Sequence, residues 1–157
     1  MQKYISAFIF LWFASQCLGQ PTLQGIRHPR EAEAERVATA WLELLDAGNA
    51  TDAFDQLTDI FKGNLTPEIW KTTNEESRRN LGQLISRTFR RVVIYEDPQN
   101  APLPGTYAAV EYDSAYQNAD KHSDYVVLHS QHNEPFKVTR HESTFVLNQP
   151  PEDPDAH

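Results

Sequence analysis

The clearest group of side chains with binding chemistry is an arginine cluster near the middle of the chain. The stretch SRRNLGQLISRTFRR, residues 77–91, holds five of the nine arginines, and no acidic residue lies between Glu76 and Glu96. The chain as a whole carries a formal charge of -8. Guanidinium groups bind carboxylates and phosphates through paired hydrogen bonds. The cluster therefore predicts either a surface for an anionic partner or a counter-charge for acidic elements of the fold.

We expect the cluster to lie on a helix that spans residues 74–90. The tetrapeptide TNEE at residues 73–76 has the pattern of a capping box at the start of this helix. One face of the helical wheel is apolar and is formed by Leu81, Leu84, Ile85, Thr88 and Phe89. The edge of this face holds Arg78, which we expect to form a structural ion pair with Glu31 or Asp46.

The opposite side of the predicted helix carries Arg79, Arg87 and Arg90. Positive charges in the last turns of a helix gain about 0.3–1 kcal/mol each from its dipole. Like charges three or four residues apart cost about 0.2–0.5 kcal/mol per pair. Because the two effects nearly cancel, helix stability alone does not account for these arginines. They form either a solvated face or, in the more specific hypothesis, a binding surface for an acidic protein or another anionic component of the cell envelope.

Catalytic and metal-binding patterns are weak in this sequence. His129 and His132 are three residues apart on or beside a predicted strand and would point to opposite faces, so we expect no metal site there. His141-Glu142 begins like a zinc-protease motif, but Phe145 stands where the second histidine is required. The sequence contains no Gly-x-Ser-x-Gly motif and no phosphate-binding glycine loop. We therefore expect neither a metal nor another cofactor.

The N-terminal segment has the features of a secretory signal peptide. Lys3 supplies the positive charge, and the apolar run YISAFIFLWFA at residues 4–14 is too short to span a membrane. The small residues of CLG, at 17–19, fit a cleavage site. A lipid anchor on Cys17 is the alternative, although the residues before it depart from the pattern that lipoprotein signals prefer. We expect residues 1–19 to be removed, which leaves a periplasmic or secreted protein without stable membrane insertion.

Hydrophobic periodicity predicts one α+β domain over residues 30–147, with Trp41 in its core. A flexible leader, residues 20–29, precedes it, and a disordered tail rich in proline and acids, residues 148–157, follows it. Helices are predicted at residues 30–47, 51–62 and 74–90, with a further turn that Thr66 caps and Pro67 begins. Strands are predicted at residues 91–96, 106–116, 124–131 and 136–146. The polar segment 117–123 should join the middle two strands.

The segments AWLELLDAG, LTDIFKGNLTPEIW, RRNLGQLISR and LPGTYAAVEYDSAY resemble the bacterial family called domain of unknown function 4019, over about residues 32–142. The positions that fall on motif positions of this family are Trp41, Asp46, Gly48, Trp70, Arg78, Leu81, Gly82, Arg87, Pro104, Gly105 and Tyr107. Two departures are Phe54, where tryptophan is expected, and NEPF in the last hairpin, where Gly-Trp is usual. The resemblance implies an exported protein whose helices pack on a four-stranded, antiparallel, curved sheet, in a cystatin-like or nuclear-transport-factor-like cone.

Function follows less directly from these patterns than the fold does. The acidic balance of the chain argues against nucleic acid as a partner, because phosphate binding needs a positive surface. Cone folds can host acid–base chemistry between helix and sheet, and Tyr112 with His129 or Asp113 are the candidate groups. Tyr112 and Asp113 cannot both enter such a pocket, because adjacent strand residues face opposite ways. We expect an exported, non-catalytic binding or accessory domain of the cell envelope; a small cone-fold enzyme and a purely structural envelope protein are the alternatives.

Overall fold

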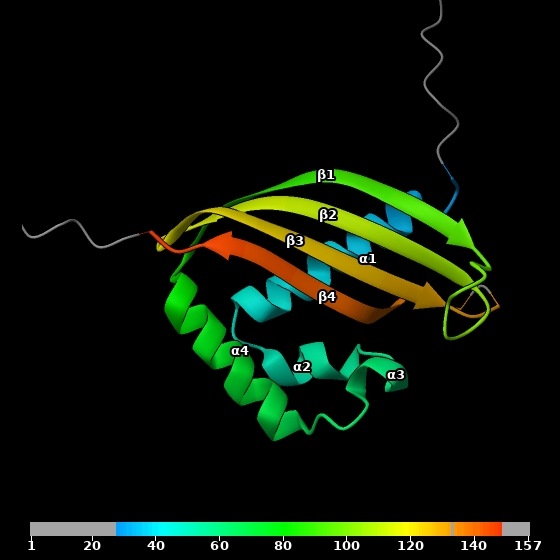
Figure 1. The fold of residues 1–157 in the computed structure, drawn as a ribbon, viewed down its shortest axis with the longest axis horizontal. Coiled ribbons are helices and arrows are strands. Elements are labelled where there is room, and N and C mark those ends of the chain that lie inside the picture. The colour runs from blue at the N-terminus through cyan, green and yellow to red at the C-terminus, as the bar shows by residue number, and fades with distance from the viewer. Residues whose placement is uncertain (1–27, 133, 149–157) are drawn as a thin grey trace, which may run out of the picture.

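In the part of the chain that the structure describes, four helices come first and a four-stranded antiparallel sheet follows them (Figure 1). The structure is a computed structural model that describes residues 28–132 and 134–148. The helices are α1 (Glu31–Asp46), α2 (Ala50–Asp55), α3 (Asp59–Lys62) and α4 (Pro67–Leu81). The strands are β1 (Leu84–Glu96), β2 (Thr106–Tyr116), β3 (Ala119–Ser130) and β4 (Lys137–Val146). The predicted α+β class and the antiparallel curved sheet are thus confirmed.

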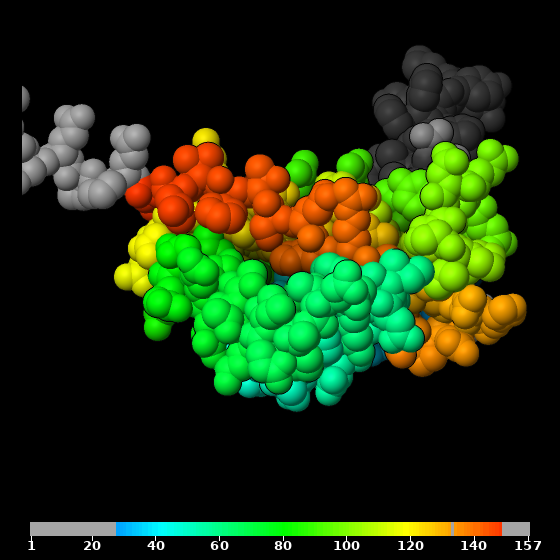
Figure 2. All heavy atoms as spheres, turned by 60° about the horizontal axis from the view of Figure 1, so that its bottom comes forward, coloured from blue at the N-terminus to red at the C-terminus, as the bar shows by residue number. Residues whose placement is uncertain are grey.

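The sheet is a simple meander, with strand order β1-β2-β3-β4, and it arches over the helices (Figure 1). Helix α1 runs along the concave face, while α2, α3 and α4 close the space beside it. In the space-filling view α4, α2 and α3 form a continuous surface next to β4, so the core is covered on this side (Figure 2). Among the described residues, no helix is long and apolar enough to cross a membrane. The predicted signal peptide, most of the leader and almost all of the tail lie outside the described residues.

Helix α1 packs on the sheet through a stripe of residues at helical spacing, which are Ala34, Ala38, Trp41, Leu42 and Leu45. Trp41 is fully buried, as predicted, and its indole Nε1 donates a hydrogen bond of 3.0 Å to the carbonyl of Ala53. The helix ends at Asp46, and Gly48 follows it two residues later with a φ of 81°, which suits glycine. Backbone bonds from Gly48 to Leu45 and from Asn49 to Leu44 complete a Schellman cap.

The second predicted helix, residues 51–62, is divided into α2 and α3 by a contact with the sheet. Leu57 forms a parallel bridge with Val138 of β4, and the amide of Thr58 donates to the carbonyl of Val138 at 2.8 Å. Thr58 then caps α3 by accepting a hydrogen bond from the amide of Phe61. The backbone around residues 56–58 therefore protects one end of the β4 edge, which periodicity alone does not reveal.

The largest correction concerns the arginine cluster. Helix α4 begins at Pro67, capped by Thr66 as predicted for a turn there, and it ends at Leu81 rather than at residue 90. Gly82, with φ 75° and ψ −156°, stops the helix, and residues 84–90 belong to β1. The TNEE segment consequently lies inside α4 and does not start a helix. Strand β3 also begins earlier than predicted, so that two residues, Gln117 and Asn118, separate it from β2.

Candidate functional site

A buried ion network lies on the concave face near the start of β1 and the end of α1. Arg87 projects inward from β1, opposite Ser114 of β2, and its side chain is only 9% exposed. Its guanidinium binds both carboxylate oxygens of Asp46, the last residue of α1. It also donates to the Tyr116 hydroxyl at 2.7 Å and to Ser114 Oγ at 3.2 Å. Arg87 thus ties the end of α1 to two strands.

Asp124 of β3 is the second acidic member of this network and is almost fully buried. Its Oδ1 contacts His141 Nε2 at 3.0 Å, and its Oδ2 lies 3.7 Å from Arg87 Nη2. His122 Nδ1 is 3.3 Å from Oδ2 but outside hydrogen-bond geometry, and it has no hydrogen-bond partner within the described residues. Burial alone would raise the pKa of Asp124, but the contacts from His122 and His141 outweigh burial and hold this pKa well below its usual range.

The neighbouring phenol stays protonated in this environment. Burial raises the pKa of Tyr116 above its ordinary value, and Asp46 reinforces the shift although Arg87 opposes it. The Tyr116 hydroxyl can therefore donate to Asp46 Oδ1, which lies 3.2 Å away. Each carboxylate of the network, Asp46 and Asp124, consequently has several donors around it.

The Ser143, His141 and Asp124 side chains superficially match the residue types of a catalytic triad. Ser143 Oγ lies 3.3 Å from His141 Nε2, and Asp124 Oδ1 lies 3.0 Å from the same nitrogen. A triad requires the carboxylate and the hydroxyl on different ring nitrogens, so that one orients the ring while the other gives up its proton. The cavity among these side chains measures only about 50 Å³, which is room for water rather than for a substrate. The geometry does not support nucleophilic catalysis here.

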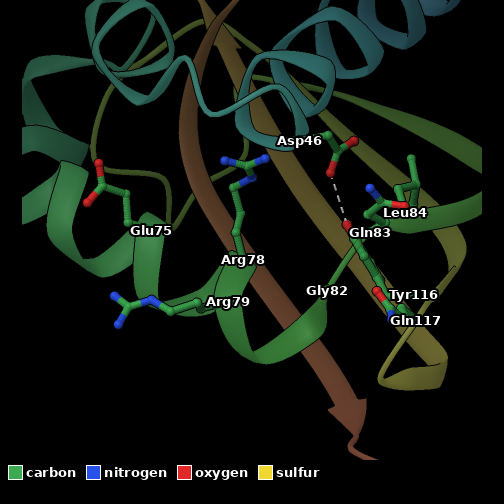
Figure 3. Close-up of a pocket in the computed structure, with 9 residues that line it drawn as sticks. All are labelled: Asp46, Glu75, Arg78, Arg79, Gly82, Gln83, Leu84, Tyr116 and Gln117. Carbon is green, nitrogen blue, oxygen red and sulfur yellow. Dashed lines mark hydrogen bonds between the residues drawn. The ribbon is translucent and has the colours of Figure 1, made fainter.

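A larger open groove adjoins the network, between the last turns of α4, the end of α1 and the start of β1 (Figure 3). Its volume is about 620 Å³, and it is lined by Asp46, Glu75, Arg78, Arg79, Gly82, Gln83, Leu84, Tyr116 and Gln117. Arg78 reaches toward the end of α1, while Asp46 and Tyr116 meet at the strand side of the groove (Figure 3). Asp46, Arg78 and Tyr116 also line the small cavity around Asp124, so the groove sits directly against the network.

The charges that line this groove are unequally paired. Asp46 is bound by Arg87, and Glu75 lies 3.8 Å from Lys71. In the part of the chain that the structure describes, neither Arg78 nor Arg79 forms an ion pair or a side-chain hydrogen bond. The two carboxylates of the groove, Asp46 and Glu75, thus have cationic partners outside the groove lining. The two guanidinium groups of the groove, Arg78 and Arg79, are available to a ligand.

The structure separates the arginines that the sequence placed on one helix face. Arg79 is exposed on α4, Arg87 is buried in the network, and Arg90 lies on the outer face of the sheet, 3.3 Å from Asp113. The prediction that the three share one surface is therefore wrong, because β1 starts before Arg87. The predicted ion pair of Arg78 is also wrong. Its guanidinium packs against Gly48 at the end of α1, and Arg87 takes the place beside Asp46.

The two pocket candidates for acid–base chemistry also lie apart. The Tyr112 hydroxyl faces α1 and lies 2.8 Å from Thr39 Oγ1. His129 pairs with Tyr107, five residues from Tyr112 along β2, so it projects from the opposite face of the sheet. Its Nε2 lies 3.0 Å from the carbonyl of Pro104. Because they lie on opposite faces of the described sheet, they do not share a pocket there. Within residues 28–132 and 134–148, no group of three or more His, Cys, Asp or Glu side chains could hold a metal ion.

Sequence reasoning missed Asp124 and considered His141 only as the start of a zinc-protease motif. It named Asp46 as a family motif position and as a possible partner of Arg78, but not as a partner of Arg87. The sequence does contain a sign that Arg87 points inward from a strand. Arg87 and Phe89 alternate with Thr88, as the inward residues of a strand do. Nothing in the sequence indicates that Asp124 and Arg87 are neighbours. They come together only through the register of β1, β2 and β3.

Comparison with known proteins finds one family. The family model described as Protein of unknown function (DUF4019) matches residues 37–140, which include Asp46, Arg87 and Asp124. No curated protein and no solved structure matches the chain.

Proposed function

We propose that this chain, which belongs to the DUF4019 family of proteins of unknown function, is an exported, non-catalytic binding domain of the cell envelope. Its ligand site is the groove between α4 and β1, and the ligand or partner protein presents an anionic group to Arg78 and Arg79. Export is supported by the apolar run at residues 4–14 and the small residues that follow it.

The observation that carries this proposal is the pairing of charges in the groove. Two guanidinium groups without partners among the described residues face about 620 Å³ of open space, while both lining carboxylates are already paired. Arginine forks are suited to bidentate binding of carboxylate or phosphate. In a chain with a formal charge of -8, two adjacent guanidinium groups without acidic partners would direct an anionic group to one place.

Binding is favoured over catalysis because the buried charged groups contact one another and leave no room for a substrate. Asp124 is surrounded by His141, His122 and Arg87, in a cavity too small for a substrate. Such a network holds the strand side of the groove in one conformation, which lowers the entropic cost of binding. This supports a preformed binding site whose rigid wall contains Asp46 and Tyr116.

The test is a direct binding measurement with a fluorescent hexaglutamate peptide, read by fluorescence anisotropy at low salt. We expect binding that weakens as salt is added, because exposed charges are screened. The double variant R78E/R79E and the single variant R79E should each weaken binding by at least about tenfold, which corresponds to about 1.4 kcal/mol.

The matched control is Arg36→Glu, an exposed arginine of α1 that has no ion-pair partner among the described residues and does not line the groove. It changes the net charge as much as R79E does and should leave the affinity close to that of the native chain. Equal losses in R36E and R79E would mean that the peptide senses only the overall charge. The absence of binding at low salt would also refute the proposal, provided that thermal unfolding shows the protein to be folded.

A further inference from the structure

A second pocket lies on the outer, convex face of the sheet, away from the groove of α4. Three tyrosines form its walls, Tyr95 of β1, Tyr107 of β2 and Tyr125 of β3. Tyr95 and Tyr107 are direct partners across β1 and β2, and Tyr107 and Ala109 lie on the face opposite to the core residues Ala108 and Val110. The small side chain of Ala109, together with Val127, leaves a hollow of about 530 Å³ between the rings.

The loop between β1 and β2 closes one side of this pocket and is held in place by side chains. The Tyr107 hydroxyl donates to the carbonyl of Leu103 at 3.0 Å. His129 contacts the carbonyl of Pro104 at 3.0 Å, and the amide of Gly105 donates to Asp97 Oδ1 at 2.7 Å. Segment 98–102 lines the pocket from this loop. The wall is thus fixed before any ligand arrives, as in most small-molecule sites.

The chemistry of the lining restricts what can bind. Among the described residues that line the pocket, Arg140 alone is charged, and it is engaged by Glu142. The uncharged polar groups are the amides of Gln99 and Asn100, the hydroxyl of Thr139 and the tyrosine hydroxyls. A neutral lining of this kind complements an uncharged ligand, since a buried unpaired charge would cost free energy.

The shape of the pocket adds a second restriction. Tyr95 is 48% exposed and Ile60, at the rim, is 47% exposed, so a bound ligand keeps one side in water. A wholly apolar molecule would leave much of its surface wet there. The ligand that fits has an apolar ring face to stack on tyrosine and a hydroxylated edge for the amides and for solvent. A pyranose sugar has both features.

From these contacts we infer that the outer face of the sheet is a binding site for a neutral glycan, whose sugar rings stack on Tyr95 and Tyr125. This site is independent of the anion-binding groove proposed above, because no residue in the described ranges lines both. The two proposals can therefore fail separately.

The experiment titrates the full chain with the neutral disaccharides cellobiose, maltose and N,N′-diacetylchitobiose, followed by amide chemical shifts in solution NMR. At least one of them should shift the amides of Ala109 and Val127, while Arg79 in the groove stays unshifted. Tyr95→Ala and Tyr125→Ala should each weaken the binding by at least about tenfold. Tyr125→Phe keeps the ring and should retain most of the affinity. Phe145→Ala removes an exposed aromatic ring of β4 outside this pocket and should change nothing.

Several results would overturn the inference. The first is that none of the three disaccharides shifts the pocket amides up to its solubility limit. The second is that binding survives both tyrosine-to-alanine changes in a protein with native-like amide spectra. The third is that the charged dimer digalacturonate binds more tightly than the neutral sugars. A proline-rich peptide that shifts these amides when the sugars do not would assign the pocket to a protein partner instead.

Discussion

Arg87 holds two carboxylates that come from distant parts of the chain, Asp46 at the end of α1 and Asp124 in β3. Taking an arginine and two carboxylates out of water costs several kcal/mol per ion, and only good geometry with further hydrogen bonds offsets that cost. Tyr116 and Ser114 provide those bonds on the arginine side, and His141 provides one on the side of Asp124. At the scale of residues, the network therefore specifies where α1 ends on the sheet more than it adds stability.

Removing one charged member of this network should lower the stability of the fold, because its former partners stay buried without it. Asp124→Asn leaves Arg87 and the two histidines without their shared carboxylate, and we expect a loss of about 3–5 kcal/mol in the free energy of unfolding at pH 7. Urea denaturation followed by tryptophan fluorescence measures this loss. The matched control is Asp113→Asn, whose carboxylate is exposed and pairs with Arg90 on the outer face, and which should have little effect.

The same variant tests the pH dependence of stability. Because the pKa of Asp124 is lowered in the folded state, its carboxylate stabilises the fold above the unfolded pKa of about 3.9. That stabilisation is lost as the pH falls below about 5 toward the lower, folded pKa. The difference in unfolding free energy between the native chain and Asp124→Asn should therefore shrink between pH 5 and pH 3. A difference that stays constant over this range would contradict the assignment.

At the scale of elements, the junction between α4 and β1 decides which arginines face the groove. The sequence supported the long helix because Leu81, Leu84, Ile85, Thr88 and Phe89 recur at helical spacing. The alternation of Arg87 and Phe89 with Thr88 fits a strand equally well, and hydrogen bonding to β2 selects the strand. Two elements were predicted closely because their hydrophobic patterns fit only one kind of structure. Helix α1 has one apolar stripe and a glycine cap, and β2 has β-branched and aromatic residues.

The candidate site could be predicted only in part, for the same reason. Arg79 was predicted on the exposed side of a helix, and local sequence suffices for that. Arg78 was placed on the same helix, but in an ion pair that the structure does not contain. The groove that they line depends on where Gly82 stops the helix and on the β2–β3 turn at Gln117. Those contacts between distant segments follow from strand register, which a single sequence does not reveal.

Gly82 is the residue that makes this junction possible. Its φ of 75° with ψ of −156° lies in a region that residues with a Cβ avoid, and a Cβ would come within 2.9 Å of the Gln117 Cβ. We expect Gly82→Ala to lower the free energy of unfolding by about 1–3 kcal/mol, as measured by urea denaturation. Gln83→Ala, at the next and exposed position, serves as the control and should be nearly neutral. A Gly82→Ala protein as stable as the native chain would mean that α4 and β1 join by a different turn.

At the scale of the whole molecule, the two binding surfaces that we propose lie on one small domain and differ in character. The groove of α4 lies at the end of the helical layer, and the tyrosine pocket lies on the outer face of the sheet beside the β1–β2 loop. The buried network adjoins the groove, and the sheet separates it from the tyrosine pocket. Such an arrangement suits an accessory domain that joins an anionic partner to a neutral glycan of the cell envelope.

That role requires the protein to leave the cytoplasm. The first nineteen residues predict where the signal peptide is cleaved. Expressed with its own leader in a bacterial host with two membranes, the mature protein should begin at Gln20 and appear in the periplasmic fraction or the medium. N-terminal sequencing and intact mass measure the start. A mass that includes a diacylglyceryl group on Cys17 would show instead that the protein is a lipoprotein.

The variant Cys17→Ser separates the two routes. Cleavage after Gly19 needs only a small residue at position 17, so the serine variant should be processed and exported like the native chain. Lipoprotein processing depends on the cysteine itself, so on that route the variant would accumulate as an uncleaved precursor in the membrane fraction. Native protein that keeps residues 1–19 and stays in the cytoplasm would remove the basis for an envelope role, while the groove and the tyrosine pocket would still be open to the binding experiments described above.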